Sequence, residues 1–570
     1  MVQTESPKAA EGEGGRYTLA PRTLAAVVLA VCLAQIALSV PSLINGLVQQ
    51  DLAPSSAQLT WITEAFMLPV AALGLGFGVF GDLFGRKRLL VGGAALIAVG
   101  SVLAILVPGV GSSADDTPVT LLILAQVLSG VGAAAIFPTS LAMVAAGTHT
   151  TATRARGVAI WATALSVGGF LGPLLAGLSA KIELGWAGNA NWRWAFVGVL
   201  VIAAASVVLS LALAQNSSSP EGRSVDWPGQ ITAALGLFAL MYAVIQGAET
   251  GWSEPQIVIA FIAAVVFLAL FVFVENRAAE PLLLLSVFRN RAFAMNSVVT
   301  LIGMFAFLVI MYGTSIRLTI IQGFSPLQSS VAYLFFGGIG FVLLPLTSKL
   351  LERYNPRWVL CTALTLVGAS GLWFAAVPTT SRALTAIVGP LILAGVGSAL
   401  AFASITAVAV NTLPNHLAGM ASGVTSTFRD LGFALGPAIA GAIALSRAAD
   451  EIAGKLAANP ALRSAYEAFQ AAPAHAPAEQ KAQLEAAVHA VESGPLGANS
   501  VPATITTPDG QVVPFNPLKD VAFDALSSSY SLAYVLGGVA ALVAAALILV
   551  GVRGGVDQAH LDDDPHTLDG

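Results

Sequence analysis

Residues Gly168–Gly177 read GGFLGPLLAG, and residues Gly432–Gly441 read GFALGPAIAG. Both stretches follow one pattern, which is Gly, three residues, Gly-Pro, two residues and Ala-Gly. On a helix, Gly172 and Gly436 each lie in a stripe of small residues spaced four positions apart. Such a stripe lets another helix approach closely in lipid, where packing replaces the hydrophobic effect as the force between helices. The pattern therefore predicts two closely packed membrane helices.

A second pair of stretches keeps nearly the same register. Residues Gly130–Phe137 (GVGAAAIF) recur as Gly395–Phe402 (GVGSALAF), so this pair is offset by 265 residues and the first pair by 264. A single Gly-x-x-x-Gly match would mean little in a chain with 56 glycines. Two matches at nearly one offset indicate that the chain is internally duplicated.

The composition is that of an integral membrane protein. Hydrophobic residues make up 56% of the 570 residues and charged residues 10%, and the mean hydropathy is +0.80, whereas soluble domains carry about 25% charged residues. The two cysteines, Cys32 and Cys361, lie in apolar runs, which excludes a disulfide framework or a thiolate metal site. No phosphate-binding Gly-rich motif for direct ATP drive is present. We expect no cofactor, no metal, no nucleic-acid partner and no enzymatic activity.

Fourteen apolar windows are long enough to cross a bilayer as helices. They fall near residues 24–45, 59–81, 89–108, 119–147, 156–180, 194–214, 228–247, 256–275, 293–317, 329–350, 358–377, 385–412, 420–446 and 530–552. The first six spans with their loops occupy about 190 residues, which is shorter than the repeat offset. Two extra helices between the halves account for the difference. We therefore predict an all-α integral membrane protein with fourteen helices arranged as six, two and six.

Positive charge predicts that both termini are cytoplasmic. The short outer loops would then hold Lys181, Arg193 and Arg382. The cytoplasmic loops and tails would hold Lys8, Arg16, Arg22, Arg86, Lys87, Arg88, Arg154, Arg156, Arg223, Arg277, Arg289, Arg291, Lys349, Arg353, Arg357 and Arg553. Trp192 and Trp194, which flank Arg193, are expected to form part of an interfacial aromatic belt. The predicted segments are a disordered cytoplasmic tail (1–20), an N-terminal six-helix bundle (21–215), a two-helix insert with its linkers (216–291), five helices of a C-terminal bundle (292–446), an extracytoplasmic insert (447–529), the last span (530–553) and a second disordered tail (554–570).

The extracytoplasmic insert is polar and alanine-rich. We predict two or three short helices between Arg447 and Ser493, followed by a hairpin from Thr504 to Val513 that turns at Pro508-Asp509-Gly510. Two interpretations stay open. The insert is partly ordered without a separate function, or it forms a cap or partner-docking site at the exit.

A charged turn between the second and third spans is the most specific motif. Residues Gly78–Arg88 read GVFGDLFGRKR, in which glycines permit a tight reversal and Asp82 lies close to three cations. The cations alone would also enforce the topology. The pattern formed by Gly78, Asp82, Gly85, Arg86 and Lys87 resembles the signature loop of the major facilitator superfamily. A degenerate counterpart, residues 350–357 (LLERYNPR), follows the tenth span.

Further stretches narrow the resemblance to the fourteen-span drug:proton antiporters, relatives of quaternary-ammonium and antibiotic exporters. These are Trp61–Phe66, Gly172-Pro173, Asp226–Gly229 and Thr427–Gly432. The resemblance implies the major facilitator fold, with Asp82 and Arg86 helping to hold one conformation. It also implies that the Gly-Pro helix biases transport toward export; the residues concerned are Gly168, Gly172, Pro173 and Gly177, with the repeat counterparts Gly432, Gly436, Pro437 and Gly441.

Two positions depart from the family's pattern. Cys32 stands where the first span usually carries an aspartate, and Gln126 stands where the fourth usually carries an arginine. An intramembrane acid and its basic counterpart are thus both replaced by uncharged residues.

Several charged residues remain inside the predicted spans. At 1.5 Å per residue, Glu64 lies about 8 Å from the outer end of its span, and Arg429 and Asp430 lie about 15 Å from the cytoplasmic end of theirs. A charge at such depth costs about 3 kcal/mol and is usually paired or functional. Adjacent helix positions diverge by about 100°, so we expect Arg429 and Asp430 to find partners on other helices. Arg317, near an outer helix end, is expected to extend to the lipid headgroups.

Asp430 is the leading candidate for proton coupling, and Glu64 is the second. Burial favours the protonated form of a carboxyl group and a nearby arginine favours the ionised form, so an acid between these effects can exchange a proton during transport. Arg429 would pair with an acid or orient the substrate.

The sequence thus predicts a secondary active exporter of small amphipathic or drug-like molecules in the plasma membrane. Two bundles would alternate access to a central cavity, with protons as the counter-ion. The expected partners are a small-molecule substrate, protons and the lipid bilayer, and the expected state is a monomer. One alternative is uniport or movement of a lipid-like substrate, which the uncharged Cys32 and Gln126 favour. The other is a non-transporting sensor or assembly protein on the same fold.

Overall fold

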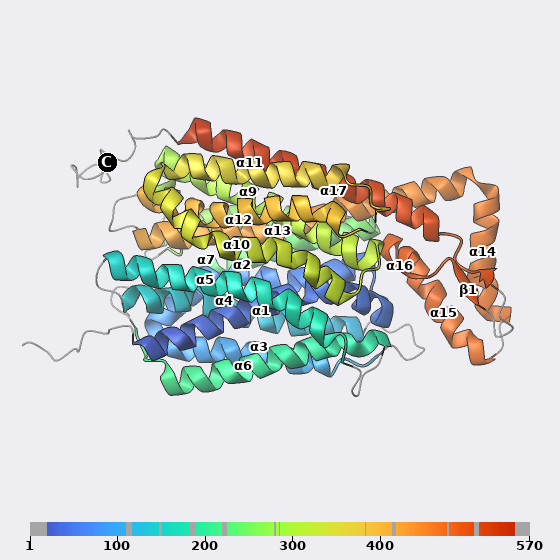
Figure 1. Cartoon of the computed structure of the whole chain (residues 1–570), viewed down its shortest axis with the longest axis horizontal. Coiled ribbons are helices and arrows are strands. Elements are labelled where there is room, and N and C mark those ends of the chain that lie inside the picture. Colours follow the sequence, from blue (N-terminus) through green and yellow to red (C-terminus); the bar gives the residue numbers. More distant parts are fainter. Residues whose placement is uncertain are drawn as a thin grey trace, which may run out of the picture.

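Long helices lie side by side in one bundle, and a smaller group of elements projects from one end (Figure 1). This computed structural model describes residues 20–109, 117–147, 151–182, 188–218, 225–278, 281–283, 285–381, 383–412, 418–475, 478–506 and 512–552. Apart from Ala20, the two predicted disordered tails lie outside these residues. We call the end with the projecting group the insert end. The other is the terminal end, because α1 begins and α17 ends there (Figure 1).

The helices fall into two halves and a connecting pair. The N-terminal half holds α1 (Pro21–Leu52), α2 (Ser56–Phe84), α3 (Arg86–Ile105), α4 (Thr117–Ala146), α5 (Thr151–Ser179), the short η1 (Gly188–Trp192) and α6 (Arg193–Leu213). The connecting pair is α7 (Trp227–Thr250) and α8 (Pro255–Glu275). The C-terminal half holds η2 (Leu285–Arg289), α9 (Arg291–Ile316), the π-helical turn η3 (Arg317–Ile321), α10 (Pro326–Arg353), α11 (Pro356–Ala376), α12 (Thr385–Asn411), α13 (Ala418–Ala458) and α17 (Lys519–Gly551).

Twelve helices in the described part of the chain are long and apolar enough to cross a bilayer, so the protein is a multi-pass membrane protein. Each of the fourteen predicted spans overlaps one of the fourteen long helices of the two halves and the connecting pair. The two long helices outside the set of twelve are α5, whose apolar run is Thr163–Ser179, and α10. Two helices continue past their predicted spans, α13 as far as Ala458 and α17 from Lys519 onward.

Local sequence signals start the second helix of each half in the same way. The side chain of Ser55 accepts a hydrogen bond from the backbone of Gln58, whose side chain accepts one from the backbone of Ser55. Ser325 and Gln328 form the same reciprocal cap before α10. These caps satisfy backbone N–H groups that the first turn of a helix leaves without partners.

The internal duplication is visible in how each half packs. Helix α5 packs against α1, and α13 packs against α9. A Cβ added to Gly172 would lie 2.7 Å from the Cβ of Ser39, and one added to Gly436 would lie 2.8 Å from the Cβ of Leu308. Real side chains do not approach so closely, so each glycine stripe is a place where two helix backbones touch.

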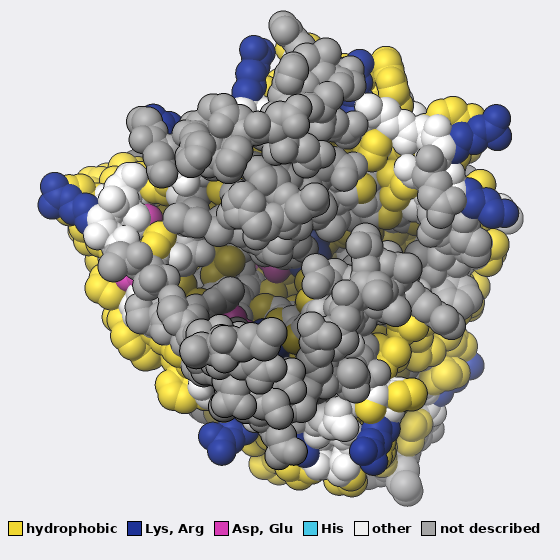
Figure 2. Space-filling model, turned by 90° about the vertical axis from the view of Figure 1, so that its left-hand side faces the viewer, with side chains coloured by type: hydrophobic (Ala, Val, Ile, Leu, Met, Phe, Trp, Pro, Cys, Tyr) yellow, Lys and Arg dark blue, Asp and Glu magenta, His cyan; other side chains and the backbone are white. Residues whose placement is uncertain are grey.

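The two halves meet toward the insert end. Thr60 of α2 lies 3.3 Å from Tyr312 of α9, measured between their hydroxyl oxygens. Ser315 donates a hydrogen bond to the carbonyl oxygen of Ser42, and Ser330 donates one to that of Pro173. The face at the terminal end, in contrast, is hollowed near its middle, with hydrophobic and acidic side chains visible at depth (Figure 2).

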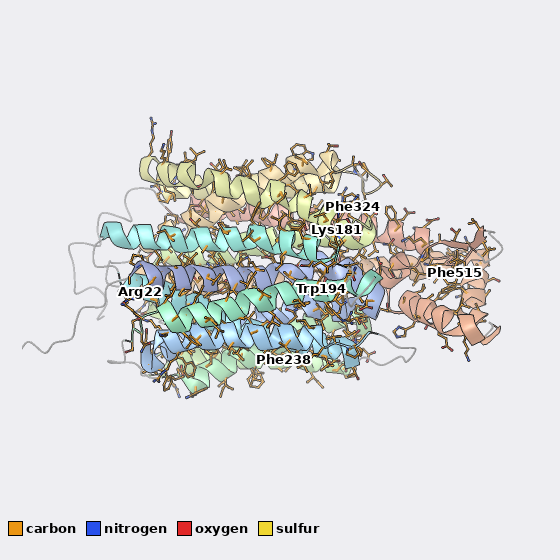
Figure 3. The ribbon with its side chains drawn as sticks, turned by 60° about the horizontal axis from the view of Figure 1, so that its bottom comes forward. Arg22, Lys181, Trp194, Phe238, Phe324 and Phe515 are labelled. Carbon is orange, nitrogen blue, oxygen red and sulfur yellow. The ribbon has the colours of Figure 1, made fainter. Side chains whose placement is uncertain are left out.

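The projecting group forms a small unit with its own apolar contacts. It contains α14 (Pro460–His475), α15 (Ala478–Glu492), α16 (Pro495–Ser500) and the antiparallel strands β1 (Thr504–Thr506) and β2 (Val512–Pro514). Phe469 meets Phe515 edge to face, with ring centroids 5.3 Å apart (Phe515 is labelled in Figure 3). The predicted short helices and hairpin are confirmed, and the predicted turn residues 508–510 lie outside the described residues.

Candidate functional site

Glu64 is a fully buried acid near the contact between the halves. Neither of its carboxylate oxygens has a hydrogen-bond partner among the described residues. Glu64 lies one turn along α2 from Thr60, so both side chains are on the face that meets Tyr312. The structure therefore places the second candidate acid beneath the closed insert end.

Arg429 and Asp430 pair with each other. Nε and Nη2 of Arg429 both lie 2.9 Å from Oδ1 of Asp430. The expectation that each would find its partner on another helix is therefore wrong, because the long arginine side chain spans the angle between adjacent helix positions. The Arg429 and Asp430 side chains are 21% and 14% exposed, so this pair is accessible in a way that Glu64 is not.

Aromatic side chains gather one turn along α13 from this pair. The ring centroid of Phe433 lies 6.2 Å from that of Phe307 on α9 and 6.1 Å from that of Phe402 on α12. Phe307 also meets Phe336 of α10 at 5.7 Å. Four helices of the C-terminal half thus bring rings together beside a charged pair, which suits an amphipathic aromatic ligand.

Arg317 does not extend to the headgroups. Its side chain is 1% exposed, and Nη1 and Nη2 donate to the carbonyl oxygens of Phe374 (3.3 Å) and Pro378 (2.9 Å) at the end of α11. The physical reason is that the last carbonyls of a helix lack intrahelical partners and attract a cation. Arg317 therefore fastens the insert end of α9 to that of α11.

The predicted interfacial belt is wrong for Trp192, which is buried together with the neighbouring Arg193. Arg193 Nη1 and Trp192 Nε1 each lie 2.8 Å from Oδ2 of Asp51 at the end of α1. Arg193 also donates to the carbonyl oxygen of Val107 through Nε and Nη2. These residues join α1, α6 and the segment after α3 at the insert end.

The signature loop lies at the terminal end of the N-terminal half and is drawn together by its charges. Arg86 Nη2 lies 2.6 Å from Oδ1 of Asp82, and the backbone N–H of Arg86 donates to the carbonyl oxygen of Ser217 (2.9 Å). Lys87 Nζ donates to the carbonyl oxygen of Leu211 at the end of α6 (2.8 Å). Gly85 has a φ of +98°, a region that favours glycine. The loop thus ties α2 and α3 to the end of α6.

The remaining glycines of the predicted motifs differ in how closely they are packed. A Cβ on Gly78 would lie 3.8 Å from Pro138, which is an ordinary contact. Cβ atoms on Gly168 and Gly432 would lie 2.7 Å and 2.5 Å from backbone oxygens of α1 and α9. Gly177 and Gly441 instead face the opposite half, Gly177 against α10 and Gly441 against Thr60. The stripes after Pro173 and Pro437 therefore reach the contact between the halves.

The two positions that depart from the family's pattern are both buried. Cys32 Sγ donates to the carbonyl oxygen of Ala164 on α5 (3.1 Å). The side-chain nitrogen of Gln126 has no hydrogen-bond partner among the described residues.

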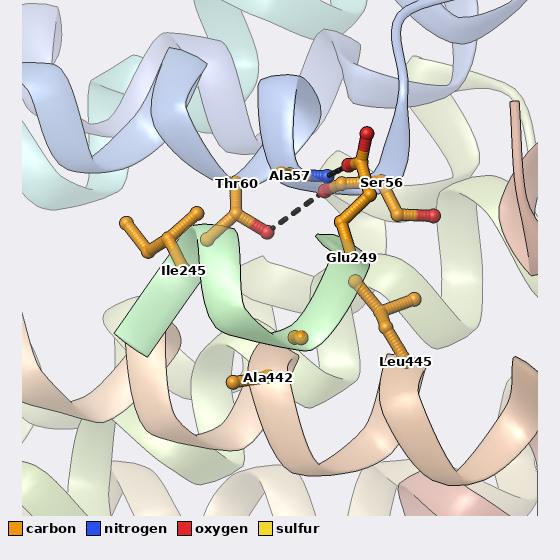
Figure 4. A pocket seen from close by; sticks show the side chains of 8 residues that line it. Ser56, Ala57, Thr60, Ile245, Glu249, Ala442 and Leu445 are labelled. Carbon is orange, nitrogen blue, oxygen red and sulfur yellow. Dashed lines mark hydrogen bonds between the residues drawn. The ribbon is translucent and has the colours of Figure 1, made fainter. Parts of the chain in front are cut away.

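Sequence reasoning missed Glu249, which joins the connecting pair to the N-terminal half. Its Oε2 accepts hydrogen bonds from the hydroxyl of Ser55 (2.7 Å) and from the backbone N–H of Ala57 (2.8 Å; Figure 4 draws the bond to Ala57). An acid on α7 thus caps the start of α2. A small, narrow pocket lies beside Glu249, between α2, α7 and α13. The position of an acid near a predicted helix end was the signal in the sequence that could have indicated this contact. Its partner Ser55, however, is 194 residues away in the chain.

The chain resembles known transporters over most of its length. It matches the family model described as Major Facilitator Superfamily over residues 27–437. It is 30% identical over 385 residues to the multidrug resistance protein Stp of Mycobacterium tuberculosis, a match that covers 68% of each chain. It is 28% identical to the multidrug efflux pump LfrA of Mycolicibacterium smegmatis, over 72% of this chain and 78% of that one. It is 26% identical to the tetracenomycin C resistance and export protein of Streptomyces glaucescens, over 72% and 74%.

Solved structures show the same fold. A peptide transporter POT in complex with alafosfalin superposes with a TM-score of 0.57 at 15% identity, covering 95% of this chain and 97% of that one. A bacterial homologue of the human lysosomal transporter Spinster, in an inward-facing and occupied conformation, gives 0.55 at 15% identity, covering 93% and 96%. The chain therefore belongs to the major facilitator superfamily of membrane transporters, which are not enzymes, and its relatives include multidrug efflux proteins.

Proposed function

We propose that this protein exports small amphipathic or drug-like molecules across the cell membrane by alternating access. The observation that carries the proposal is that the two halves touch at the insert end, whereas the terminal end is hollowed. Relatives that are named for multidrug resistance and antibiotic export support the direction of transport. In this proposal all fourteen long helices span the bilayer, both termini are cytoplasmic, residues 447–529 are outside, and the protein works as a monomer.

Protons are the proposed counter-ion, with Asp430 as the first coupling residue. Asp430 is partly exposed and already paired with Arg429. A proton or a cationic substrate that takes the carboxylate releases the arginine, so the two ligands compete for one group. The cluster of Phe307, Phe402 and Phe433 beside the pair would hold the aromatic part of the same substrate.

Glu64 is the proposed second coupling residue. A buried ionised carboxylate without a partner costs several kcal/mol, so closure over Glu64 favours its neutral form. Opening of the insert end would let water reach Glu64 and allow it to ionise. The uncharged Cys32 and Gln126 keep uniport as the alternative function, because the charged pair common in the family is missing at those positions.

Flux in reconstituted vesicles tests the proposal. Ethidium, an aromatic cation, serves as the probe with and without a pH gradient. We expect Asp430→Asn to abolish gradient-driven flux while the protein stays folded, and Glu64→Gln to weaken it. Glu467→Gln removes an exposed carboxylate of α14 and serves as the matched control, with normal flux expected. Full gradient-driven flux in the Asp430→Asn, Glu64→Gln double variant would show that neither acid couples protons, and uniport would then be the better interpretation.

A further inference from the structure

The short helix α16 lies over the insert end of the bundle, next to the start of α17 (Figure 1). Five of its six residues are buried, although it follows a group of elements that projects away from the bundle. It contacts α1 and α2 of the N-terminal half, and also η3, α13 and α17 of the C-terminal half. A helix with neighbours in both halves occupies the place where the halves must part for this end to open.

Asn499 fixes α16 to the C-terminal half. Its side chain is fully buried, and Nδ2 donates to the carbonyl oxygen of Ile320 in the π-helical turn η3 (2.9 Å). In this turn the backbone N–H of Gln322 donates to the backbone carbonyl oxygen of Arg317, five residues earlier in the chain (2.8 Å). A π-helical turn shifts the hydrogen-bond ladder by one residue, which frees a carbonyl oxygen for an outside partner. The irregular end of α9 therefore provides the acceptor that Asn499 uses.

A second asparagine holds α16 to α17. Asn516 Nδ2 donates to the carbonyl oxygens of Ala498 (2.7 Å) and Val501 (3.0 Å), and its Oδ1 accepts the backbone N–H of Leu518, directly before α17 (2.9 Å). Lys519, the first residue of α17, also donates to the carbonyl oxygen of Asn499. These polar contacts are all with the C-terminal half.

The contact of α16 with the N-terminal half is close, but among the described residues it includes no hydrogen bond like those of Asn499 and Asn516. A Cβ added to Gly494, directly before α16, would lie 3.7 Å from the Cβ of Ser56 at the start of α2. We propose that α16 is the external plug of the export pathway, carried by the C-terminal half through the positioning residue Asn499, and that the plug parts from α2 at Ser56 and Gly494 when the insert end opens. This inference rests on the exporter function proposed above.

A reversible cross-link tests the plug. Cysteines at positions 56 and 494, in a chain with Cys32→Ala and Cys361→Ala, would have Cβ atoms at a distance that suits a disulfide. We expect oxidation to form the bond and stop ethidium flux, and dithiothreitol to restore it. Gly494 has a φ of +118°, so Gly494→Ala controls for backbone strain without adding a thiol. Normal flux through fully cross-linked protein, or no cross-link at all, would overturn the proposal.

A labelling experiment tests the same plug without relying on transport. In the chain without native cysteines, Thr60→Cys places a thiol beneath α16. The native Thr60 is 2% exposed, so this thiol is expected to be buried. We expect Asn499→Ala and the similar-sized Asn499→Asp each to raise its rate of reaction with a membrane-impermeant maleimide added outside, by about fivefold, as expected from one lost hydrogen bond. Gln470→Ala, which removes an exposed hydrogen bond to Glu492, should leave the rate unchanged.

The two experiments separate failure of the plug from failure of the exporter. Without ethidium flux in the reduced protein the exporter proposal loses its support, while a faster external reaction in both Asn499 variants still supports the plug. Equal labelling rates in Asn499→Ala, Asn499→Asp and Gln470→Ala would overturn the role of Asn499. Reaction from the cytoplasmic side alone would show that α16 does not face outward and would overturn an external plug.

Discussion

At the scale of single residues, the buried charges divide into those that hold helices together and those that are free to change. Arg193 and Arg317 each donate to backbone carbonyl oxygens, and Arg193 also pairs with Asp51, so moving either would break several bonds at once. Glu64 has no partner among the described residues, and Asp430 has one that is its own neighbour. In the transport cycle proposed above, the protonation of these two acids would therefore change without dismantling the bundle.

Arg193 should be a strong determinant of stability. Arg193→Met removes its bonds to Asp51 and Val107 and leaves a carboxylate without its cation, which should cost about 3 kcal/mol. Asp51→Asn keeps an oxygen acceptor for Trp192 and should cost less. Lys181→Met, an exposed substitution at the same end, controls for charge removal and should change stability by less than about 0.5 kcal/mol. Thermal unfolding of the purified variants measures how their stabilities rank. Equal unfolding midpoints for Arg193→Met and Lys181→Met would contradict the prediction.

At the scale of helices, the glycine stripes set how closely α5 and α13 approach their neighbours. Gly172→Leu and Gly436→Leu would push a four-carbon side chain into Ser39 and Leu308, whose Cβ atoms already lie 2.7 Å and 2.8 Å from the added Cβ. Overpacking of this kind typically costs about 1–3 kcal/mol. We expect transport to fall more than membrane insertion. Gly92→Leu is the matched control, since a Cβ on Gly92 would meet nothing within 4 Å. Expression and flux are measured together, and normal flux in both stripe variants would mean that these contacts do not control transport.

The helices and their duplication could be predicted from the sequence because both depend on local patterns. Apolar length placed each long helix, and the spacing around Gly172 and Gly436 identified the close contacts. Tertiary contacts could not be predicted in the same way. The inward turn of Arg317 and the position of Asn499 depend on where other helices lie, and the pairing of Arg429 with Asp430 depends on how the arginine side chain bends along its own helix. Their partners are backbone carbonyls or a neighbouring residue, which carry no signal in the sequence.

At the scale of the whole molecule, the contacts between the halves explain why the chain needs both copies of its repeat. Gly177 faces α10 and Gly441 faces α2, so the end of each Gly-Pro helix packs against the opposite half. Glu249 fastens the connecting pair to the start of α2, and α16 is fastened to α9 and α17. Helix α7 also packs against α13, so the connecting pair lies against both halves. In the alternating-access cycle proposed above, the two halves would rock against each other at these contacts.

The number of spans decides which side of the membrane each loop faces. Arg22 lies at the terminal end, and Lys181 lies toward the insert end (Figure 3). Lys481 on α15 and Arg289 before α9 are both exposed, and α9 to α13 lie between them in the chain. If α10 crosses the membrane, an odd number of spans separates these two residues and they face opposite sides. If α10 does not cross, both face the same side.

Cysteine labelling at these two positions therefore distinguishes fourteen spans from a smaller number in the C-terminal half. In the chain without native cysteines, we expect Lys481→Cys to react with a membrane-impermeant maleimide in intact cells, and Arg289→Cys to react only after the membrane is opened. Lys181→Cys tests α5 when it is compared with Arg22→Cys, because α1 to α5 lie between these two exposed residues and they face opposite sides only if α5 crosses. Reaction of Lys481→Cys and Arg289→Cys from the same side would exclude α10 as a span. If that side is the cytoplasm, the insert would lie on the face opposite to the one that the exporter proposal assigns to it.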